Sequence, residues 1–400
     1  MSYTFYELMV HMENRAVINT HSHHREDETF ESFDLNRVLD DSYISWCGER
    51  FDKTYKARKD YLKKVGYKSY FVWLQKSIQQ IYNLNEKITV DNWDIISGKV
   101  CEAYKSNGHN IELLKDKCHY EKIILDAFWD PGSNNNHPEL FTPTFRINMF
   151  LFGYSKEAKD HNGNNPLKLY NTDINDIDEY IAFTKSTIAR KKDEGCVALK
   201  SALAYDRGLD FTEVSKDRAQ KAFGRTGYVV TDEDIKAFQD YVFFEICKIA
   251  AELDIPLQCH TGLGILKKTN AMQMQELIAK NPKTKFVLFH GSYPWTSDIG
   301  ALFHTYRNVY PDLCWLPLIS MTVSEKLLHE LIEVGLSDRV CWGCDTWTAE
   351  ESYGALLAMR RVLATVLSDK VDNGYISLED ARVIIDNILY NNAKKLYKLK

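Results

Sequence analysis

The sequence predicts an α/β protein, a (β/α)8 TIM barrel with a helical insertion between its first two strands. Short, almost continuously apolar runs alternate with longer amphipathic segments from about residue 120 onward. Such runs are typical of parallel strands that are buried on both faces and covered by helices. Eight runs are present when "AVINTH" near the N-terminus is counted. The chain has 400 residues, which exceeds the roughly 250 residues that such a barrel needs.

The strands follow one another with helical patterns between them. The helix expected before the fifth strand begins after Thr231, with Asp234 three residues later, which is close to a capping box. Another long helical pattern follows the last strand. In chain order, the expected strands are residues 16–21, 121–128, 144–153, 195–205, 255–260, 285–290, 313–319 and 339–345.

The surplus length lies in residues 35–119, which interrupt the alternation of strands and helices. This segment is helix-like, aromatic and charged, as in "YKARKDYLKKVGYKSYFVWLQKSIQQIYNL". We therefore expect residues 1–34 and 120–400 to form one barrel domain and residues 35–119 to form a helical insertion. The insertion would serve as a cap over the barrel or as a surface on which two copies of the chain pair.

Composition excludes several classes of partner. The net charge of −6 gives no basic surface of the kind that binds nucleic acid. The longest apolar runs have the length of strands, so we expect no membrane span. Nine cysteines, an odd number, and an N-terminus without a signal-peptide pattern favour a reducing, cytoplasmic location.

Four of the eight expected strands, the first, fifth, sixth and eighth, end in histidine or aspartate. In a barrel of this kind, the carboxyl ends of the strands line the active site. Imidazole and carboxylate groups gathered there predict a catalytic site for one divalent metal. Zinc is the first choice, with manganese, iron or cobalt as alternatives. The residues are His21, His23, His260, His290 and Asp345.

This order of residues, with Lys200 in the fourth strand, resembles the amidohydrolase superfamily. The segments "LFHGSYPW" (288–295) and "ILYNNAKKLY" (388–397) are similar to the amidohydrolase-2 branch, which includes decarboxylases, lactonases and other hydrolases. Uronate isomerases are more distant relatives. The resemblance covers the first strand and roughly residues 120–400.

The resemblance implies a role for each of these side chains. His21, His23 and His260 would bind the metal, and Asp345 would bind it and also take a proton from water. His290 would polarise the substrate or orient the water molecule. Lys200 has two open roles, since it is carbamylated in two-metal relatives and is not usually a ligand in the amidohydrolase-2 branch, where one metal is expected.

Several side chains near the expected strand ends are candidates for binding an anionic small molecule. Arginine recognises a carboxylate through two parallel hydrogen bonds, although each arginine could equally form a surface ion pair. Tryptophans after the sixth and eighth strands, Trp295 and Trp347, would supply flat apolar walls. The substrate-binding candidates are Lys200, Arg146, Tyr205, Arg207 and Trp295.

We therefore expect a metal-dependent hydrolase acting on an ester, lactone or amide of a small carboxylate-bearing substrate. The alternatives are a metal-dependent decarboxylase of an unsaturated or aromatic acid and a sugar-acid isomerase similar to uronate isomerase. A binding protein that kept the barrel is a fourth possibility, which the intact ligand set disfavours. A homo-oligomer is compatible with the sequence.

Overall fold

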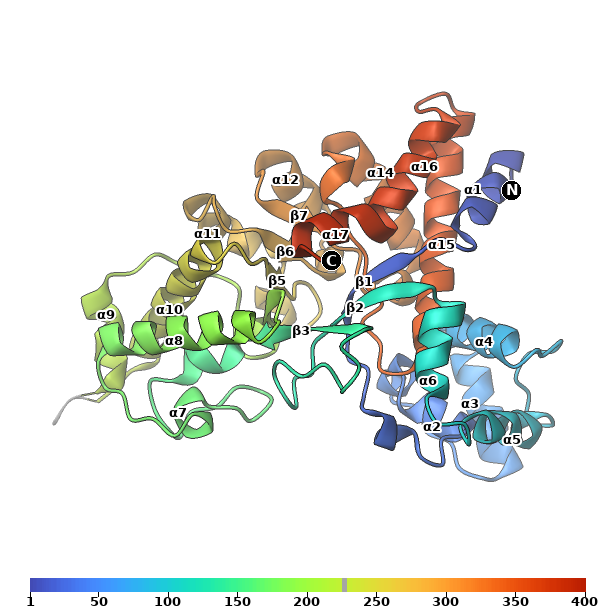
Figure 1. Ribbon diagram of the computed structural model, residues 1–400, viewed down its shortest axis with the longest axis horizontal. Helices are drawn as coiled ribbons and strands as arrows, with labels where there is room; N and C mark the ends of the chain where they lie inside the picture. Colours follow the sequence, from blue (N-terminus) through green and yellow to red (C-terminus); the bar gives the residue numbers. More distant parts are fainter. Residues whose placement is uncertain (225–228) are drawn as a thin grey trace.

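A computed structural model describes residues 1–224 and 229–400. Within these residues, seven parallel strands form one curled sheet whose spatial order follows the chain (Figure 1). The predicted fold class, a parallel barrel surrounded by helices, is confirmed. The strands are β1 (Val17–Ser22), β2 (Tyr120–Leu125), β3 (Phe141–Arg146), β4 (Ala198–Ser201), β5 (Leu257–Cys259), β6 (Phe286–Leu288) and β7 (Val309–Pro311).

The eighth predicted strand, residues 339–345, is a hydrogen-bonded but irregular segment. Cys341 forms a single parallel bridge with Asp312, just after β7. On its other side, the backbone N–H of Asp345 donates to the carbonyl oxygen of His21 in β1 at 2.9 Å. The segment therefore joins the two edges of the sheet. Asp345 has a positive φ of 60°, which ends the extended conformation there.

The prediction of a strand over 313–319 is wrong. The seventh strand lies a few residues earlier, at β7, and Leu316–Ile319 is the short helix α13. Trp315 has a positive φ of 62°, and Pro317 lies in the first turn of that helix, where proline is well tolerated. A short apolar run of this kind fits a strand and a buried helix equally well.

Helices surround the sheet, and many begin at a side-chain cap. The predicted capping box of Thr231 and Asp234 is confirmed at the start of α10. None of the helices in the described residues combines the length and apolar character needed to cross a membrane. The helices outside the insertion are α1 (Tyr3–Met12), α7 (Pro166–Leu169), α8 (Ile177–Asp193), α9 (Lys216–Gln220), α10 (Asp232–Glu252), α11 (Gln275–Lys280), α12 (Ser297–Thr305), α13, α14 (Met321–Val334), α15 (Ala349–Asp372), α16 (Leu378–Asp386) and α17 (Asn392–Tyr397).

The chain between β1 and β2 is helical, and its helices gather beside α15 at the lower right of Figure 1. Buried side chains such as Phe33, Tyr61 and Trp93 form a hydrophobic cluster made only of residues from this part of the chain. Because such a cluster stabilises its own helices, the segment has a small core beside the barrel core. Its helices are α2 (Leu35–Asp40), α3 (Tyr55–Val65), α4 (Ser69–Ile81), α5 (Trp93–Ala103) and α6 (His109–Glu112).

Two buried carboxyl groups at the start of α15 attach these helices to the barrel. Glu351 accepts a hydrogen bond from the backbone N–H of Tyr43 at 2.6 Å. Glu350 accepts hydrogen bonds from the hydroxyls of Tyr82 at 2.7 Å and Tyr104 at 3.1 Å. Burial raises the pKa of Glu351 from 4.5 to about 8, so this side chain stays protonated near neutral pH.

The raised pKa of Glu351 makes stability depend on pH. Between pH 4.5 and about 8 the unfolded chain loses this proton while the folded chain keeps it. The stabilisation is therefore complete below pH 4.5 and is lost as the pH rises through 8, at about 1.4 kcal/mol for each unit of pKa shift. Glu351→Gln should remove this slope from the free energy of unfolding measured in urea between pH 5 and 8. An unchanged slope would contradict the assignment.

Candidate active site

A group of buried side chains at the carboxyl end of β1 meets Asp345 from the eighth segment. His21 lies in β1 and His23 follows it, and both are buried. The Nε2 atoms of His21 and His23 lie 3.3 Å and 3.2 Å from the same atom, Oδ1 of Asp345. Residues more than three hundred positions apart in the sequence thus lie within contact distance at the mouth of the barrel.

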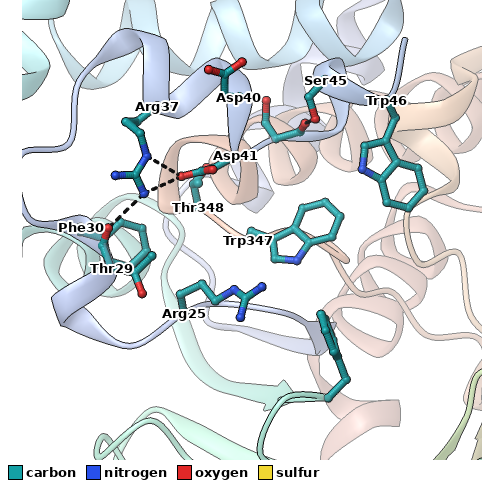
Figure 2. Close-up of a pocket in the computed structure, with 12 residues that line it drawn as sticks. Arg25, Thr29, Phe30, Arg37, Asp40, Asp41, Ser45, Trp46, Trp347 and Thr348 are labelled. Carbon is teal, nitrogen blue, oxygen red and sulfur yellow. Dashed lines mark hydrogen bonds and ion pairs between the residues drawn. The ribbon is translucent and has the colours of Figure 1, made fainter. Parts of the chain in front are cut away.

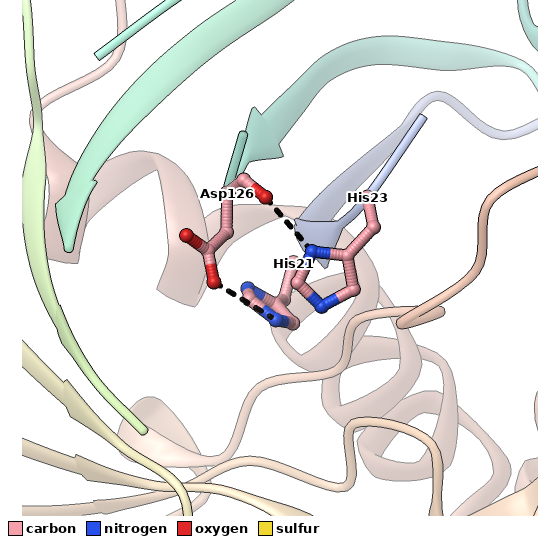
Figure 3. A group of neighbouring side chains, drawn as sticks. All are labelled: His21, His23 and Asp126. Atoms are coloured by element: carbon pink, nitrogen blue, oxygen red, sulfur yellow. Dashed lines mark hydrogen bonds and ion pairs between the residues drawn. The ribbon is translucent and has the colours of Figure 1, made fainter. Parts of the chain in front are cut away.

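Asp126, just after β2, completes this group and is absent from the sequence-based candidates. Its Oδ2 lies 4.0 Å from His21 Nε2, and its backbone carbonyl accepts a hydrogen bond from His23 Nδ1 at 2.8 Å (Figure 3). Arg146 from β3 donates to both carboxylate oxygens of Asp126, at 2.5 Å and 3.2 Å. Although burial opposes ionisation, Arg146 and the two histidines lower the pKa of Asp126 below its ordinary value.

The donor set fits a divalent metal. His21, His23 and Asp126 form one group of possible ligands, and Asp345 forms a second group with His290 and Cys314. Asp345 Oδ1 also lies beside both histidines of the first group. Such nitrogen and oxygen ligands suit zinc and related ions. Burial lowers the pKa of His21 to about 3, so its ring is neutral and a nitrogen lone pair is free to bind a metal. Despite its burial, Asp345 has a pKa well below the ordinary value because of its close contacts with His21 and His23.

His260 and His290 form a second buried pair. The Nε2 of His290 lies 3.0 Å from the Nδ1 of His260, and His290 Nδ1 lies 3.8 Å from Asp345 Oδ2. His260 Nε2 lies 2.5 Å from the carbonyl oxygen of Leu263. Both ring nitrogens of His260 thus contact protein groups. The structure places this residue beside His290, outside the group formed by His21, His23 and Asp126.

Lys200 in β4 lies against the same group. Its Nζ is 3.2 Å from His21 Nε2 and 4.1 Å from the centroid of the Phe289 ring. Burial lowers the pKa of Lys200 below its ordinary value. The side-chain nitrogen of Lys200 lies beside the candidate metal ligands, where an anion-binding or carbamylated lysine is expected from the sequence.

A cavity of about 250 Å³ opens above these residues, and this inner cavity combines polar and aromatic walls. Arg146, Lys200 and Tyr205 line it as the sequence predicts, and the Tyr205 ring packs on His260 with centroids 4.6 Å apart. Several lining residues are absent from the sequence-based candidates, because they come from loops and from the insertion. They are Tyr43, Trp46, Phe128, His161 and Asn162.

Two substrate-binding candidates lie outside this cavity. Arg207 pairs with the buried carboxylate of Asp240 at 2.8 Å, and its guanidinium lies over the Phe211 ring at 4.5 Å. Its charge is therefore already neutralised within the protein. Trp295 is not among the residues that line the inner cavity, whereas Trp347 does line it. The sequence correctly places Arg207 and Trp295 after a strand, but it does not show where their side chains point.

Comparison with known proteins agrees with this geometry. Residues 216–399 match the family model described as Amidohydrolase. Protein fluG of Emericella nidulans is 33% identical over 225 residues, which is 52% of this chain but only 26% of fluG. Uronate isomerase of Thermotoga maritima is 22% identical over 396 residues, covering 90% of this chain and 85% of that protein.

The solved structure of uronate isomerase from Thermotoga maritima superposes with a TM-score of 0.79 at 19% identity. The superposition covers 99% of this chain and 98% of the isomerase. At 19% sequence identity, this structural similarity establishes the fold. The match of residues 216–399 and the fold shared over nearly the whole chain bear out the predicted resemblance to the amidohydrolase superfamily.

Proposed function

We propose that this protein is a metal-dependent hydrolase that cleaves an ester, lactone or amide of a small, carboxylate-bearing substrate. One observation carries the proposal: the Nε2 atoms of His21 and His23 converge on Oδ1 of Asp345 at the floor of the inner cavity. A buried pair of imidazoles facing a carboxylate is a ligand set for a metal, and the cavity beside it leaves room for substrate.

His21, His23 and Asp345 would hold the ion, with Asp126 beside them. A divalent ion there would lower the pKa of a water molecule and polarise a substrate oxygen. We favour one zinc ion, with manganese, iron or cobalt as alternatives. His260 is retained as a further nitrogen ligand, which requires its ring to leave the contact with Leu263.

Side chains around the ion would carry out proton transfer and substrate binding. Asp345 is ionised and can accept a proton on Oδ2, the oxygen that faces His290. His290 contacts the Cys314 carbonyl through Nδ1 and His260 through Nε2. When His260 turns to bind the ion, Nε2 of His290 would be free to orient the reacting water or to donate a hydrogen bond to an oxygen that gains charge. The ammonium group of Lys200 would attract an anionic substrate to this end of the cavity.

An isomerase of sugar acids is the second candidate. The uronate isomerase of Thermotoga maritima supports this candidate, because its sequence match covers 90% of this chain, whereas the match with fluG covers 52%. The polar walls of the inner cavity also suit an open-chain sugar acid. The two candidates share the metal-binding residues and differ in what is done to the substrate.

The proposal extends to the location of the protein and to the role of the helices between β1 and β2. All nine cysteines lie in the described part of the chain, and none of them forms a disulfide, which agrees with a reducing, cytoplasmic environment. We propose that the helices between β1 and β2 act as a cap, because Tyr43 and Trp46 of this segment line the inner cavity.

His23→Ala tests the proposal through metal content. Protein purified without chelator should contain about one equivalent of metal, and His23→Ala should lose most of it, because one of three or four ligands is removed. His329→Ala, on the surface of α14, is the matched control and should keep the metal. Metal content is measured by plasma mass spectrometry. Full retention of metal in His23→Ala would contradict the proposed site.

The reaction itself is tested by assaying the metal-loaded protein on three substrate panels. Esters, lactones and amides report hydrolysis through acid release, hexuronates report isomerisation through ketose formation, and aromatic acids report decarboxylation through carbon dioxide. We expect acid release. Ketose formation alone would favour the second candidate and contradict hydrolysis.

A further inference from the structure

An outer cavity of about 400 Å³ lies between the helices that follow β1 and the mouth of the barrel (Figure 2). It adjoins the inner cavity, because Trp46, Phe128 and Trp347 line both. A molecule bound at the candidate metal ligands therefore has space to extend past these three aromatic side chains.

Arg25 brings a positive charge into the outer cavity. It follows His23 by two residues and is half-buried. Its guanidinium lies over the Trp129 ring at 3.9 Å and near the Phe128 ring at 5.5 Å. Among the described residues, no acidic group lies within ion-pair distance of its guanidinium. Burial lowers the pKa of Arg25, and the charges of Glu26 and Asp41 act in the opposite direction without direct contact. Such a cation is partly desolvated and has no direct carboxylate partner.

The acidic side chains that influence the pKa of Arg25, Glu26 and Asp41, have direct hydrogen-bond partners other than Arg25. Arg37 donates to the carboxylate of Asp41 at 2.9 Å and 3.0 Å, and this pair lies at the upper left of Figure 2, away from Arg25. Asp40 lies near the top of that view, above Asp41. Glu26 accepts a hydrogen bond from the indole N–H of Trp129 at 2.9 Å.

Arg25 also differs from the two arginines that the sequence singles out. Arg146 is bound to Asp126, and Arg207 is bound to Asp240, so both guanidinium groups already hold a carboxylate of the protein. A substrate carboxylate would have to displace those partners. At Arg25 it would have no partner to displace.

The distance between Arg25 and the candidate metal ligands limits the length of such a substrate. Phe128 contacts both, with its ring centroid 5.6 Å from that of His23 and 5.5 Å from Cζ of Arg25. The guanidinium therefore lies within about 11 Å of the His23 ring. A chain of several carbon atoms, with a reacting group at one end and a carboxylate at the other, spans this distance.

We propose that Arg25 binds the free carboxylate of the substrate in the outer cavity, while the reacting acyl group lies in the inner cavity. This inference rests on the proposed hydrolase function and narrows its substrate class to half-esters, half-amides or lactones of dicarboxylic acids. Hydrolysis adds water across the acyl C–O or C–N bond. The products are a dicarboxylic acid and an alcohol or amine, or a single hydroxy-acid when the substrate is a lactone.

The test uses non-reacting probes and calorimetric titration of the full-length, metal-loaded protein. The probes are α,ω-dicarboxylates from succinate to suberate, each compared with its monoamide of equal length. At the best length, we expect the dicarboxylate to bind about tenfold more tightly, on the scale of one charge-assisted contact. Arg25→Gln should remove most of this preference.

Two further variants separate the charge of Arg25 from its packing. Arg25→Lys keeps the charge without the two-pronged geometry and should restore part of the preference. Arg37→Gln changes an arginine of the same cavity that is already paired with Asp41, so the preference should persist. Circular dichroism of each variant checks that the fold is kept.

The inference is overturned if wild-type protein shows no preference for dicarboxylates at any length, or if the preference survives in Arg25→Gln. Absence of binding by every probe overturns it as well. The proposed function fails on different measurements, namely metal content and turnover. Binding of each dicarboxylate is also measured after chelation, where Arg25→Gln should weaken it relative to wild type, because Arg25 does not belong to the ligand group. This comparison therefore stays decisive if the metal site fails.

Discussion

Asp345→Asn should reduce kcat/KM by about three orders of magnitude, because the substitution removes both a metal ligand and the proton acceptor. Asp345 Oδ1 is the atom on which His21 and His23 converge, and Oδ2 faces His290. An asparagine has nearly the same shape but carries no charge and accepts no proton. Steady-state kinetics on a substrate found in the panels above, together with metal analysis, measure the effect.

The matched control is Asp254→Asn. Asp254 is an exposed carboxylate whose partners are Lys285 and Lys398, far from the inner cavity in the fold. It should leave both turnover and metal content unchanged. If Asp345→Asn kept more than about a tenth of wild-type kcat/KM, the role of this carboxylate in proton transfer would be refuted.

Arg146→Met should lower the free energy of unfolding by about 3–5 kcal/mol, the usual loss when one partner of a buried ion pair is removed. The substitution leaves Asp126 buried without its guanidinium partner. Asp126→Asn in the same chain removes the unpaired charge and should recover a substantial part of the loss. Urea unfolding of the two variants and the wild type measures both effects.

The pH dependence of this pair has a definite sign. The pKa of Asp126 is lowered in the folded chain, so the stabilisation is present above the ordinary value of 3.8 and is lost as the pH falls below it. Arg207→Met is the control, because Asp240 keeps a second cation, Lys236, at 2.7 Å. Arg207→Met should lower the free energy of unfolding by less than Arg146→Met does. Equal decreases in the free energy of unfolding of Arg146→Met and Arg207→Met would contradict the conclusion that Asp126 depends on Arg146.

The fold follows from the sequence because strands buried on both faces need apolar residues along their whole length. Seven of the eight predicted ranges overlap a strand or the bridge at Cys341. The range 313–319 failed because its apolar residues are buried in a helix rather than in a strand. The lengths of β3 and β4 were overestimated, since their apolar runs continue into short 3-10 helices.

The site was only partly predictable, for a different reason. Strand ends meet at one edge of a barrel, so position alone brought together His21, His23 and Asp345. The same rule would have found Asp126 at the end of "IILD". Side-chain pairing between distant loops has no such signal. The sequence therefore did not show that Arg207 is held by Asp240, nor that Arg25 has no carboxylate within ion-pair distance in the described part of the chain.

The most direct test of the central claim is a crystal structure of the metal-loaded protein, with anomalous scattering recorded at the absorption edge of the bound metal. We expect one anomalous peak at about 2.0–2.2 Å from Nε2 of His21, Nε2 of His23 and a carboxylate oxygen of Asp345. A peak elsewhere in the chain, or no peak in protein that is shown to be active, would contradict the account.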